Sequence, residues 1–237
     1  MCLNKIFKSK DKTSQPSDVM DENINNIKPI KILIDNGHGA ETLGKRSPYS
    51  CCGVEPCIEF YEWEWNREIA RHIVDHLKTS GFDAELLVEE TYDVSLKERV
   101  NRVNSFCNYL GKDNVILISI HSNAAGDGTK WCNARGWSVY TSIGETKSDK
   151  LANYLYAEAE KEFINHSLKI RTDMQDGDKD YESNLYICKN TKCVAVLSEN
   201  FFFDNIDDVQ YILSDEGKSS IIKIHVDGII KYITENY

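Results

Sequence analysis

The sequence has too few basic residues for a nucleic-acid-binding protein. It contains 28 Lys and Arg against 38 Asp and Glu in 237 residues, which gives a formal net charge of −10 at pH 7. Binding to nucleic acid depends on basic patches that meet the phosphate backbone, and an acidic surface repels phosphate. The composition therefore argues against nucleic acid as a partner.

Long apolar segments are missing as well. The longest apolar run, residues 115–120, is far shorter than the roughly 20 residues of a membrane-spanning helix, so no membrane span is expected. The basic N-terminal segment is not followed by the apolar stretch of about 7–15 residues that marks a secretory signal peptide. We expect a protein made in the cytoplasm, with a flexible leader over residues 1–30 and one folded domain over residues 31–237.

The cysteines lack the paired CxxC spacing of a structural zinc site. Without a signal peptide, reduced thiols are expected. A local disulfide in the loop around residue 51 is the alternative if the protein works outside the cytoplasm. The eight cysteines are Cys2, Cys51, Cys52, Cys57, Cys107, Cys132, Cys188 and Cys193.

From residue 31 onward, short apolar runs alternate with helical patterns. This alternation predicts an α/β fold: a single domain with a mainly parallel twisted sheet flanked by helices on both faces. Strands are expected over residues 31–35, 84–88, 115–120, 137–141 and 194–197, and helices around residues 69–77, 96–110, 147–163 and 216–234.

Two segments interrupt the alternation. Residues 39–61 form a long loop, and loops of this length are usually functional or disordered. Residues 167–184 are polar and contain Asp176, Asp178 and Asp180. An EF-hand is rejected there because the required Gly and Glu are replaced by Tyr181 and Ile187, so a solvated acidic loop is expected.

Polar residues follow three of the predicted strands. His38 comes after the first strand, His121 ends the third, and Glu199 ends the strand that follows Cys193. Ligands of open α/β sheets bind at the carboxyl ends of strands, so these side chains are expected to share one site. Two imidazoles with a third protein ligand are typical of a catalytic zinc site that keeps one position open for water.

The third ligand is expected to be a carboxylate where the helix bearing Ile69 begins, and both Glu62 and Glu64 qualify. Glu199 would then be free to take a proton from the metal-activated water. Each residue also has a structural interpretation. A lone buried histidine is often a hydrogen-bonded core residue, and a glutamate at a helix N-terminus stabilises the helix dipole.

Five segments in a fixed order cover nearly all of residues 31–235. They are Lys31-Ile-Leu-Ile-Asp-Asn-Gly-His-Gly39, Glu62-x3-Asn66-x2-Ile69-Ala70, Leu96-x2-Arg99-x3-Arg102-x-Asn104, Ile118-Ser-Ile-His-Ser-Asn-Ala124 and Ala195-Val-Leu-Ser-Glu-Asn200. Together they resemble the catalytic domain of zinc-dependent N-acetylmuramoyl-L-alanine amidases of the amidase type 3 family.

The resemblance implies a peptidoglycan hydrolase that cleaves the amide between N-acetylmuramic acid and the L-alanine of the stem peptide. It implies one zinc ion per chain held by His38, Glu62 and His121, with Glu199 as the catalytic carboxylate. Glu62 is preferred because the family's ligand lies four residues before the position that matches Asn66.

Other positions bear on this resemblance. Arg99 belongs to the family pattern, in either a structural or a substrate role. Asn36 and Ala40 stand where the family often has Pro and Gly, so the first loop is expected to differ in shape. Trp63 and Trp65 either stack on sugar or pack the start of the helix.

Two other functions stay open at this stage. One is a zinc peptidase that cuts within the stem peptide, and the other is a cell-wall binding module with a degenerate site. The expected place of action is the cell wall or periplasm, with a muropeptide as substrate and any protein activator unidentified. The lack of a recognisable export signal fits either a phage-type lysin released by other means or a chain whose leader sequence was not recognised.

Overall fold

The computed structural model describes residues 30–49, 57–164, 166 and 168–237. The expected leader, apart from Ile30, lies outside the described residues, as do Cys2, Cys51 and Cys52. The strands are β1 (Lys31–Asn36), β2 (Asp83–Leu86), β3 (Val115–Asn123), β4 (Ser138–Thr141), β5 (Tyr181–Glu182) and β6 (Val194–Phe202). The helices are α1 (Glu62–Thr79), α2 (Leu96–Leu110), the short 3-10 helix η2 (Lys112–Asn114), α3 (Lys147–Phe163), α4 (Tyr186–Asn190), α5 (Ile206–Leu213) and α6 (Asp215–Asn236).

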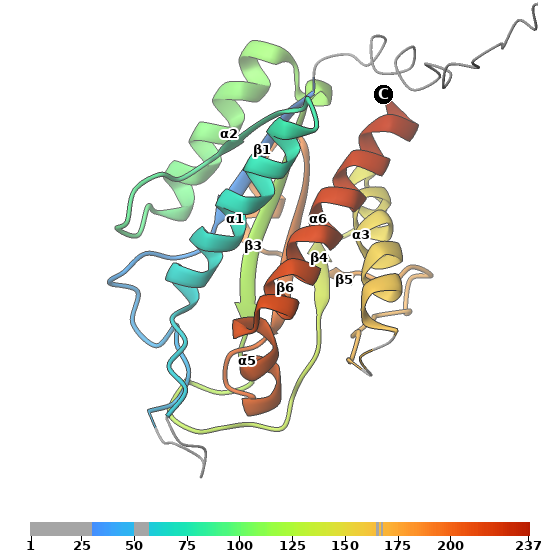
Figure 1. Cartoon of the computed structure of the whole chain (residues 1–237). Coiled ribbons are helices and arrows are strands. Elements are labelled where there is room, and N and C mark those ends of the chain that lie inside the picture. Colours follow the sequence, from blue (N-terminus) through green and yellow to red (C-terminus); the bar gives the residue numbers. More distant parts are fainter. Residues whose placement is uncertain (1–29, 50–56, 165, 167) are drawn as a thin grey trace, which may run out of the picture.

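The strands form one twisted sheet in the order β2-β1-β3-β6-β4-β5 (Figure 1). All neighbouring pairs are parallel except β4 and β6, which are antiparallel. The predicted fold class, a mainly parallel α/β sheet, is therefore confirmed. Since β1, β3 and β6 are adjacent and parallel, their carboxyl ends meet at one edge of the sheet.

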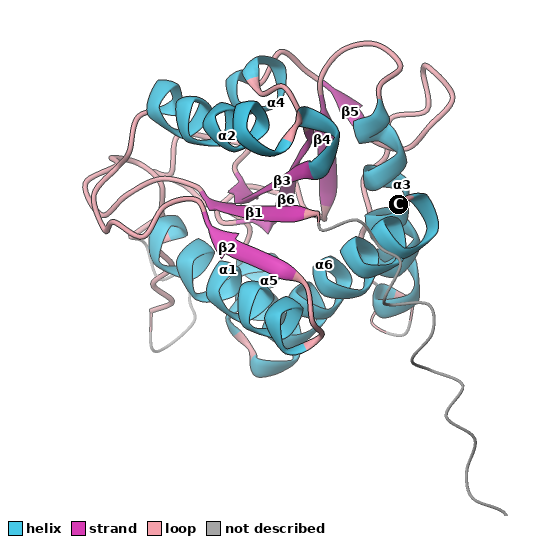
Figure 2. Cartoon of the chain, turned by 90° about the horizontal axis from the view of Figure 1, so that it is seen from above, coloured by secondary structure: helices cyan, strands magenta, loops and turns pink. Residues whose placement is uncertain are grey.

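Helices cover both faces of this sheet, as Figure 2 shows, with α2 and α4 on one side and α1, α5 and α6 on the other. The apolar run in β3 follows from this arrangement, because its alternate residues enter different cores. Ile116 and Ile118 belong to the larger core, whereas Val115 and Leu117 belong to the smaller one. No described helix has both the length and the apolar character needed to cross a membrane.

Local signals set the helix boundaries. Ser95 caps α2 by accepting a hydrogen bond from the backbone N–H of Glu98, and Thr146 opens α3 with a capping box that includes Asp149. Gly111 ends α2 with a φ of 90°, a conformation that glycine adopts without steric cost. These caps account for the close match between the predicted and observed bounds of both helices.

Two expectations need correction. Asp180 is only 1% exposed and its carboxylate accepts a hydrogen bond from Thr141, so the acidic segment is not solvated throughout. The pairing of β5 with β4 brings Asp180 into the interior. Cys57 is disulfide-bonded, so the expectation of reduced thiols is wrong for this residue, whereas Cys107, Cys132, Cys188 and Cys193 are free.

Candidate metal centre

His38 lies in the tight turn that leaves β1. Its φ of 66° is left-handed, an unusual conformation for a residue with a side chain. The turn is also pressed against the next histidine, because a Cβ atom at Gly37 would lie 2.1 Å from Cε1 of His121. Only glycine therefore fits at position 37 while the imidazole of His121 keeps its place.

His121 lies near the end of β3, where its backbone pairs in register with Glu199 on β6. The centroids of the His38 and His121 rings are 4.9 Å apart, and the rings are nearly perpendicular, at 87°. Two imidazoles from neighbouring parallel strands thus converge at the edge of the sheet.

Glu62 is the first residue of α1, and its side chain is completely buried. Its Oε1 atom is 3.1 Å from Nδ1 of His121 and 3.4 Å from Nε2 of His38. The same oxygen accepts a hydrogen bond of 3.0 Å from the backbone N–H of Ser122. One carboxylate oxygen therefore faces both imidazoles.

The donor set suits a divalent transition-metal ion. His38, Glu62 and His121 each offer a ligand atom, and these atoms lie within 4.8 Å of one another; no other such group of His, Cys, Asp or Glu occurs in the part of the chain that the structure describes. Nε2 of His38 and Oε2 of Glu62 are buried and form no hydrogen bond with any of the described residues. Two nitrogens and one carboxylate oxygen match the ligands of catalytic zinc sites.

Electrostatics within the cluster favour an ionised Glu62. Burial alone raises the pKa of this carboxyl, but the hydrogen bond with His121 and the close contact with His38 outweigh burial and hold the pKa well below its usual range. Burial lowers the pKa of His38, which favours the neutral imidazole that a metal requires. The pKa of His121 is raised, because its contact with Glu62 overcomes the effect of burial.

Glu199 lies beside this cluster and lines the same pocket as both histidines. Burial raises the pKa of its carboxyl to about 7, and within the described part of the chain its buried Oε2 atom has no hydrogen-bond partner. A carboxyl with a pKa near neutrality can both accept and release a proton at physiological pH.

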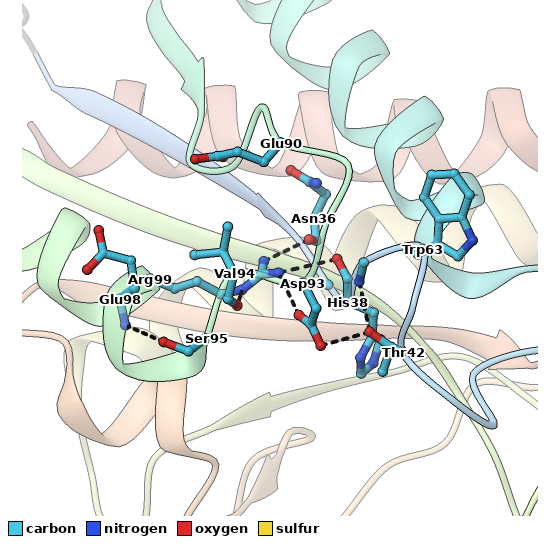
Figure 3. Close-up of polar contacts among 12 residues, drawn as sticks. Asn36, His38, Thr42, Trp63, Glu90, Asp93, Val94, Ser95, Glu98 and Arg99 are labelled. Atoms are coloured by element: carbon cyan, nitrogen blue, oxygen red, sulfur yellow. Dashed lines mark hydrogen bonds and ion pairs between the residues drawn. The ribbon is translucent and has the colours of Figure 1, made fainter.

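Arg99 fixes the backbone around His38 (Figure 3). Its side chain is 2% exposed, and one guanidinium nitrogen donates to the carboxylate of Asp35 at 2.5 Å and to the carbonyl of Asn36 at 2.8 Å. A second nitrogen donates to the carbonyl of His38 at 3.3 Å and to Asp93 at 3.4 Å. The guanidinium of Arg99 is therefore occupied in holding the turn after β1. Of the two roles considered for Arg99, structural or substrate-binding, these contacts fit the structural one.

A neutral network supports the strand that carries His121. The side-chain amide of Asn200 donates to the carbonyl of His121 at 2.9 Å and to the hydroxyl of Ser198 at 3.1 Å. Oδ1 of Asn200 accepts a hydrogen bond from the indole of Trp137, and Nε2 of the buried His225 lies 2.9 Å from the Ser198 hydroxyl.

A pocket of about 400 Å³ opens over the cluster. His38, Lys45, His121 and Glu199 line it, and another part of its wall comes from the start of α2 and from α4. Leu96 and Tyr186 on that wall are 51% and 43% exposed, so apolar surface borders the polar site. A ligand with both polar and apolar groups fits this division.

The structure brings together all four residues singled out from the sequence, His38, Glu62, His121 and Glu199. Glu64 instead faces solvent. Trp65 is buried and donates to the carbonyl of Ile212, so helix packing is its role.

Sequence reasoning missed Lys45 and the α4 wall of the pocket. Lys45 lies in a loop whose pattern carries no periodic signal. Helix α4 has only five residues, too few for a helical pattern to be seen.

Comparison with known proteins supports the resemblance. The family profile described as N-acetylmuramoyl-L-alanine amidase matches residues 32–231. The chain is 28% identical over 204 residues to the N-acetylmuramoyl-L-alanine amidase CwlM of Bacillus licheniformis, a match that covers 85% of this chain and 68% of that protein. It is 24% identical over 210 residues to the endolysin of Bacillus phage SPP1, covering 85% of this chain and 65% of the endolysin.

Solved structures share the fold. The crystal structure of an N-acetylmuramoyl-L-alanine amidase from Clostridium difficile 630 superimposes with a TM-score of 0.67 at 23% identity, covering 88% of this chain and 98% of that one. The profile match spans most of the described domain and includes every residue of the cluster. The chain therefore belongs to the N-acetylmuramoyl-L-alanine amidase family of peptidoglycan hydrolases, amidase type 3.

Proposed function

We propose that this amidase depends on one zinc ion per chain, held by His38, Glu62 and His121. The observation that carries the proposal is the convergence of two imidazole nitrogens and one carboxylate oxygen within 4.8 Å, beside the pocket that both histidines line. The domain that does this work is residues 31–237, within which the family match lies.

A bound zinc ion would supply Lewis acidity and bring the pKa of a coordinated water to about 7. His38 and His121 line the pocket, so an ion held between them would be accessible to water and substrate. The carboxylate of Glu62 offsets only part of the ion's charge, so a net positive charge remains to polarise a carbonyl group.

Glu199 is the proposed catalytic carboxylate. Its raised pKa, about 7, lets it accept the proton of the attacking water. The same group then donates that proton to the departing alanine nitrogen, so one carboxyl acts first as base and then as acid. Pairing with His121 across β3 and β6 keeps Glu199 next to the ligand cluster throughout.

The substrate would be the amide between N-acetylmuramic acid and the L-alanine of the stem peptide. The apolar wall of Leu96 and Tyr186 supports this assignment, because it offers contact surface beside the polar centre. The endolysin among the relatives favours a phage-type lysin that acts at the cell wall.

Metal analysis and product analysis together test the proposal. Wild-type protein should hold one zinc per chain and release muropeptides with a free L-alanine amino terminus while the sugar chain stays intact. Glu199→Gln should keep the zinc and lose about 10²–10⁴-fold in turnover, the contribution typical of general acid–base catalysis. His38→Ala should lose the metal as well.

Glu64→Gln is the matched control for Glu62→Gln, because Glu64 lies on the same helix turn but faces solvent. Only the Glu62 variant should lose metal. New termini within the stem peptide would show a peptidase instead, and a wild-type protein that binds no zinc would leave only a wall-binding role. An active, zinc-free His38→Ala protein would rule out the proposed ligand set.

A further inference from the structure

The loop before α1 places Lys45 next to Glu62, one of the proposed ligands. The carbonyl oxygen of Lys45 accepts a hydrogen bond of 3.0 Å from the backbone N–H of Glu62, and the next residue, Arg46, forms a β-bridge with Tyr61. This short antiparallel contact aligns the loop with the start of α1. The position of Lys45 relative to Glu62 is therefore fixed by the backbone.

Lys45 lines the pocket together with His38, His121 and Glu199. Its Nζ atom is 3.8 Å from Oε2 of Glu62 and 5.9 Å from the centre of the Phe203 ring. The side chain is 39% exposed, and its ammonium group lies over the Phe203 ring while it also approaches the buried carboxylate of Glu62.

The two oxygens of Glu62 have different surroundings. Oε1 meets both imidazoles and the backbone N–H of Ser122. Oε2 is buried and receives no hydrogen bond from the described residues, and its ion-pair contact is Lys45. A buried carboxylate oxygen requires a compensating charge or donor, and Lys45 is placed to supply it.

Arg99, the other cation of the pocket, is not available for this task. Its guanidinium is occupied by Asp35, Asp93 and the carbonyls of the first turn. Lys45 makes no comparable set of bonds to the residues that the structure describes, and it approaches Glu62 from a different segment of the chain.

We propose that Lys45 is a positioning residue for the metal centre: it holds Oε2 of Glu62, so that Oε1 alone is presented to the ion between the two histidines. This inference rests on the proposed metal-dependent function. It gives the first part of the loop over residues 39–61 a role: Lys45 fixes the orientation of Glu62 through Oε2, the carboxylate oxygen that faces away from the histidines. Outer partners of this kind orient ligands in metal sites generally.

Metal affinity tests the proposal without relying on catalysis. Zn²⁺ binding to the full chain is measured by competition with a chromophoric chelator for wild type, Lys45→Met and Lys45→Arg. Lys45→Met keeps the apolar stem and removes the charge, and it is expected to weaken Zn²⁺ binding by about 10–100-fold, the usual cost of losing an outer partner. Lys45→Arg should restore most of the affinity, because it restores the charge.

Lys147→Met is the matched control, since Lys147 is 72% exposed and pairs with Asp113 away from the pocket. It should bind Zn²⁺ like the wild type. The Co²⁺-substituted proteins provide a second measurement: the visible absorption of Lys45→Met should change as the freed carboxylate alters its coordination, whereas that of Lys147→Met should not. Thermal unfolding of the metal-free proteins verifies that each variant is folded.

The outcomes separate this inference from the proposed function. If wild-type protein binds no Zn²⁺, the proposed metal dependence fails. If wild type binds Zn²⁺ and Lys45→Met binds it equally well with an unchanged Co²⁺ spectrum, the positioning role of Lys45 is overturned and the metal centre stands. A rise in KM alone, with metal affinity unchanged, would also overturn it, because it would assign Lys45 to the substrate.

Discussion

The two histidines of the metal centre are held by opposite means. His38 sits in a left-handed turn outside the sheet and is fixed through charge, by the guanidinium of Arg99. His121 lies inside β3 and is held by the sheet and a neutral network through Asn200. The comparison teaches that a strained turn needs strong, charged contacts, whereas a strand needs only neutral ones.

Removing the charge from the turn should have the largest effect. Arg99→Met leaves Asp35 buried without its ion-pair partner, so we expect a loss of about 3–5 kcal/mol in the free energy of unfolding. Chemical denaturation measures this loss. Arg102→Met is the control because Arg102 is partly exposed on the same helix, and its ion pair with Glu90 lies at the surface. Equal losses in the two variants would contradict a special role for Arg99.

The second prediction concerns the close approach of the turn at Gly37 to the His121 ring. Gly37→Ala places a methyl group 2.1 Å from the His121 ring, so the imidazole or the turn must move. A misplacement of about 1 Å near the reacting groups can cost about 100-fold, and we expect this loss in kcat/KM together with weaker Zn²⁺ binding.

Gly126→Ala serves as the control for this change, since its new Cβ would lie 3.3 Å from Cys132 Sγ, a contact that a small shift relieves. Hydrolysis of purified peptidoglycan and chelator competition report the two effects. If Gly37→Ala keeps full metal affinity, the two histidines are less tightly coupled than the structure indicates.

The neutral hydrogen-bond network that supports His121 should make the stability of the protein depend on pH. Burial lowers the pKa of His225 to about 4, against about 6.5 in the unfolded chain. Between these values the unfolded state binds a proton that the folded state does not, so stability falls as the pH falls from about 6.5 to 4. The full effect of this group is at most about 3 kcal/mol.

Urea denaturation at pH 7.5, 6 and 5 measures this slope. His225→Gln, which has no titrating group in this range, should show a smaller loss of stability on acidification than the wild type. His72→Gln, on the exposed face of α1, should keep the wild-type slope. A wild-type slope in His225→Gln would place the acid sensitivity elsewhere.

Much of the fold follows from patterns in the sequence, and the exceptions have physical reasons. Helices α2 and α3 carry caps and long apolar stripes, so their bounds are predictable. Helices α4 and α5 have five and eight residues, and their positions depend on contacts with the sheet rather than on periodicity. The antiparallel direction of β4 likewise depends on pairing that a single strand does not reveal.

The candidate site divides in the same way. Strand ends point to His38, His121 and Glu199, because residues there share one edge of the sheet. Which of Glu62 and Glu64 faces the histidines depends on the direction in which α1 leaves its loop. The strand and helix patterns leave both open, and only the family resemblance favoured Glu62. The contacts of Lys45 and Arg99 join segments that are separated in the sequence, so no local sequence pattern predicts them.

The pairing of His121 with Glu199 has a consequence for how such a protein can vary. These residues are register partners on adjacent strands, so the hydrogen bonds of the sheet fix the spacing of their backbones. The chain between them leaves the sheet after β3, forms β4, α3, β5 and α4, and returns in β6. The chain between β3 and β6 can therefore gain or lose segments, which changes the surface that contacts the substrate, while His121 and Glu199 keep their relative positions.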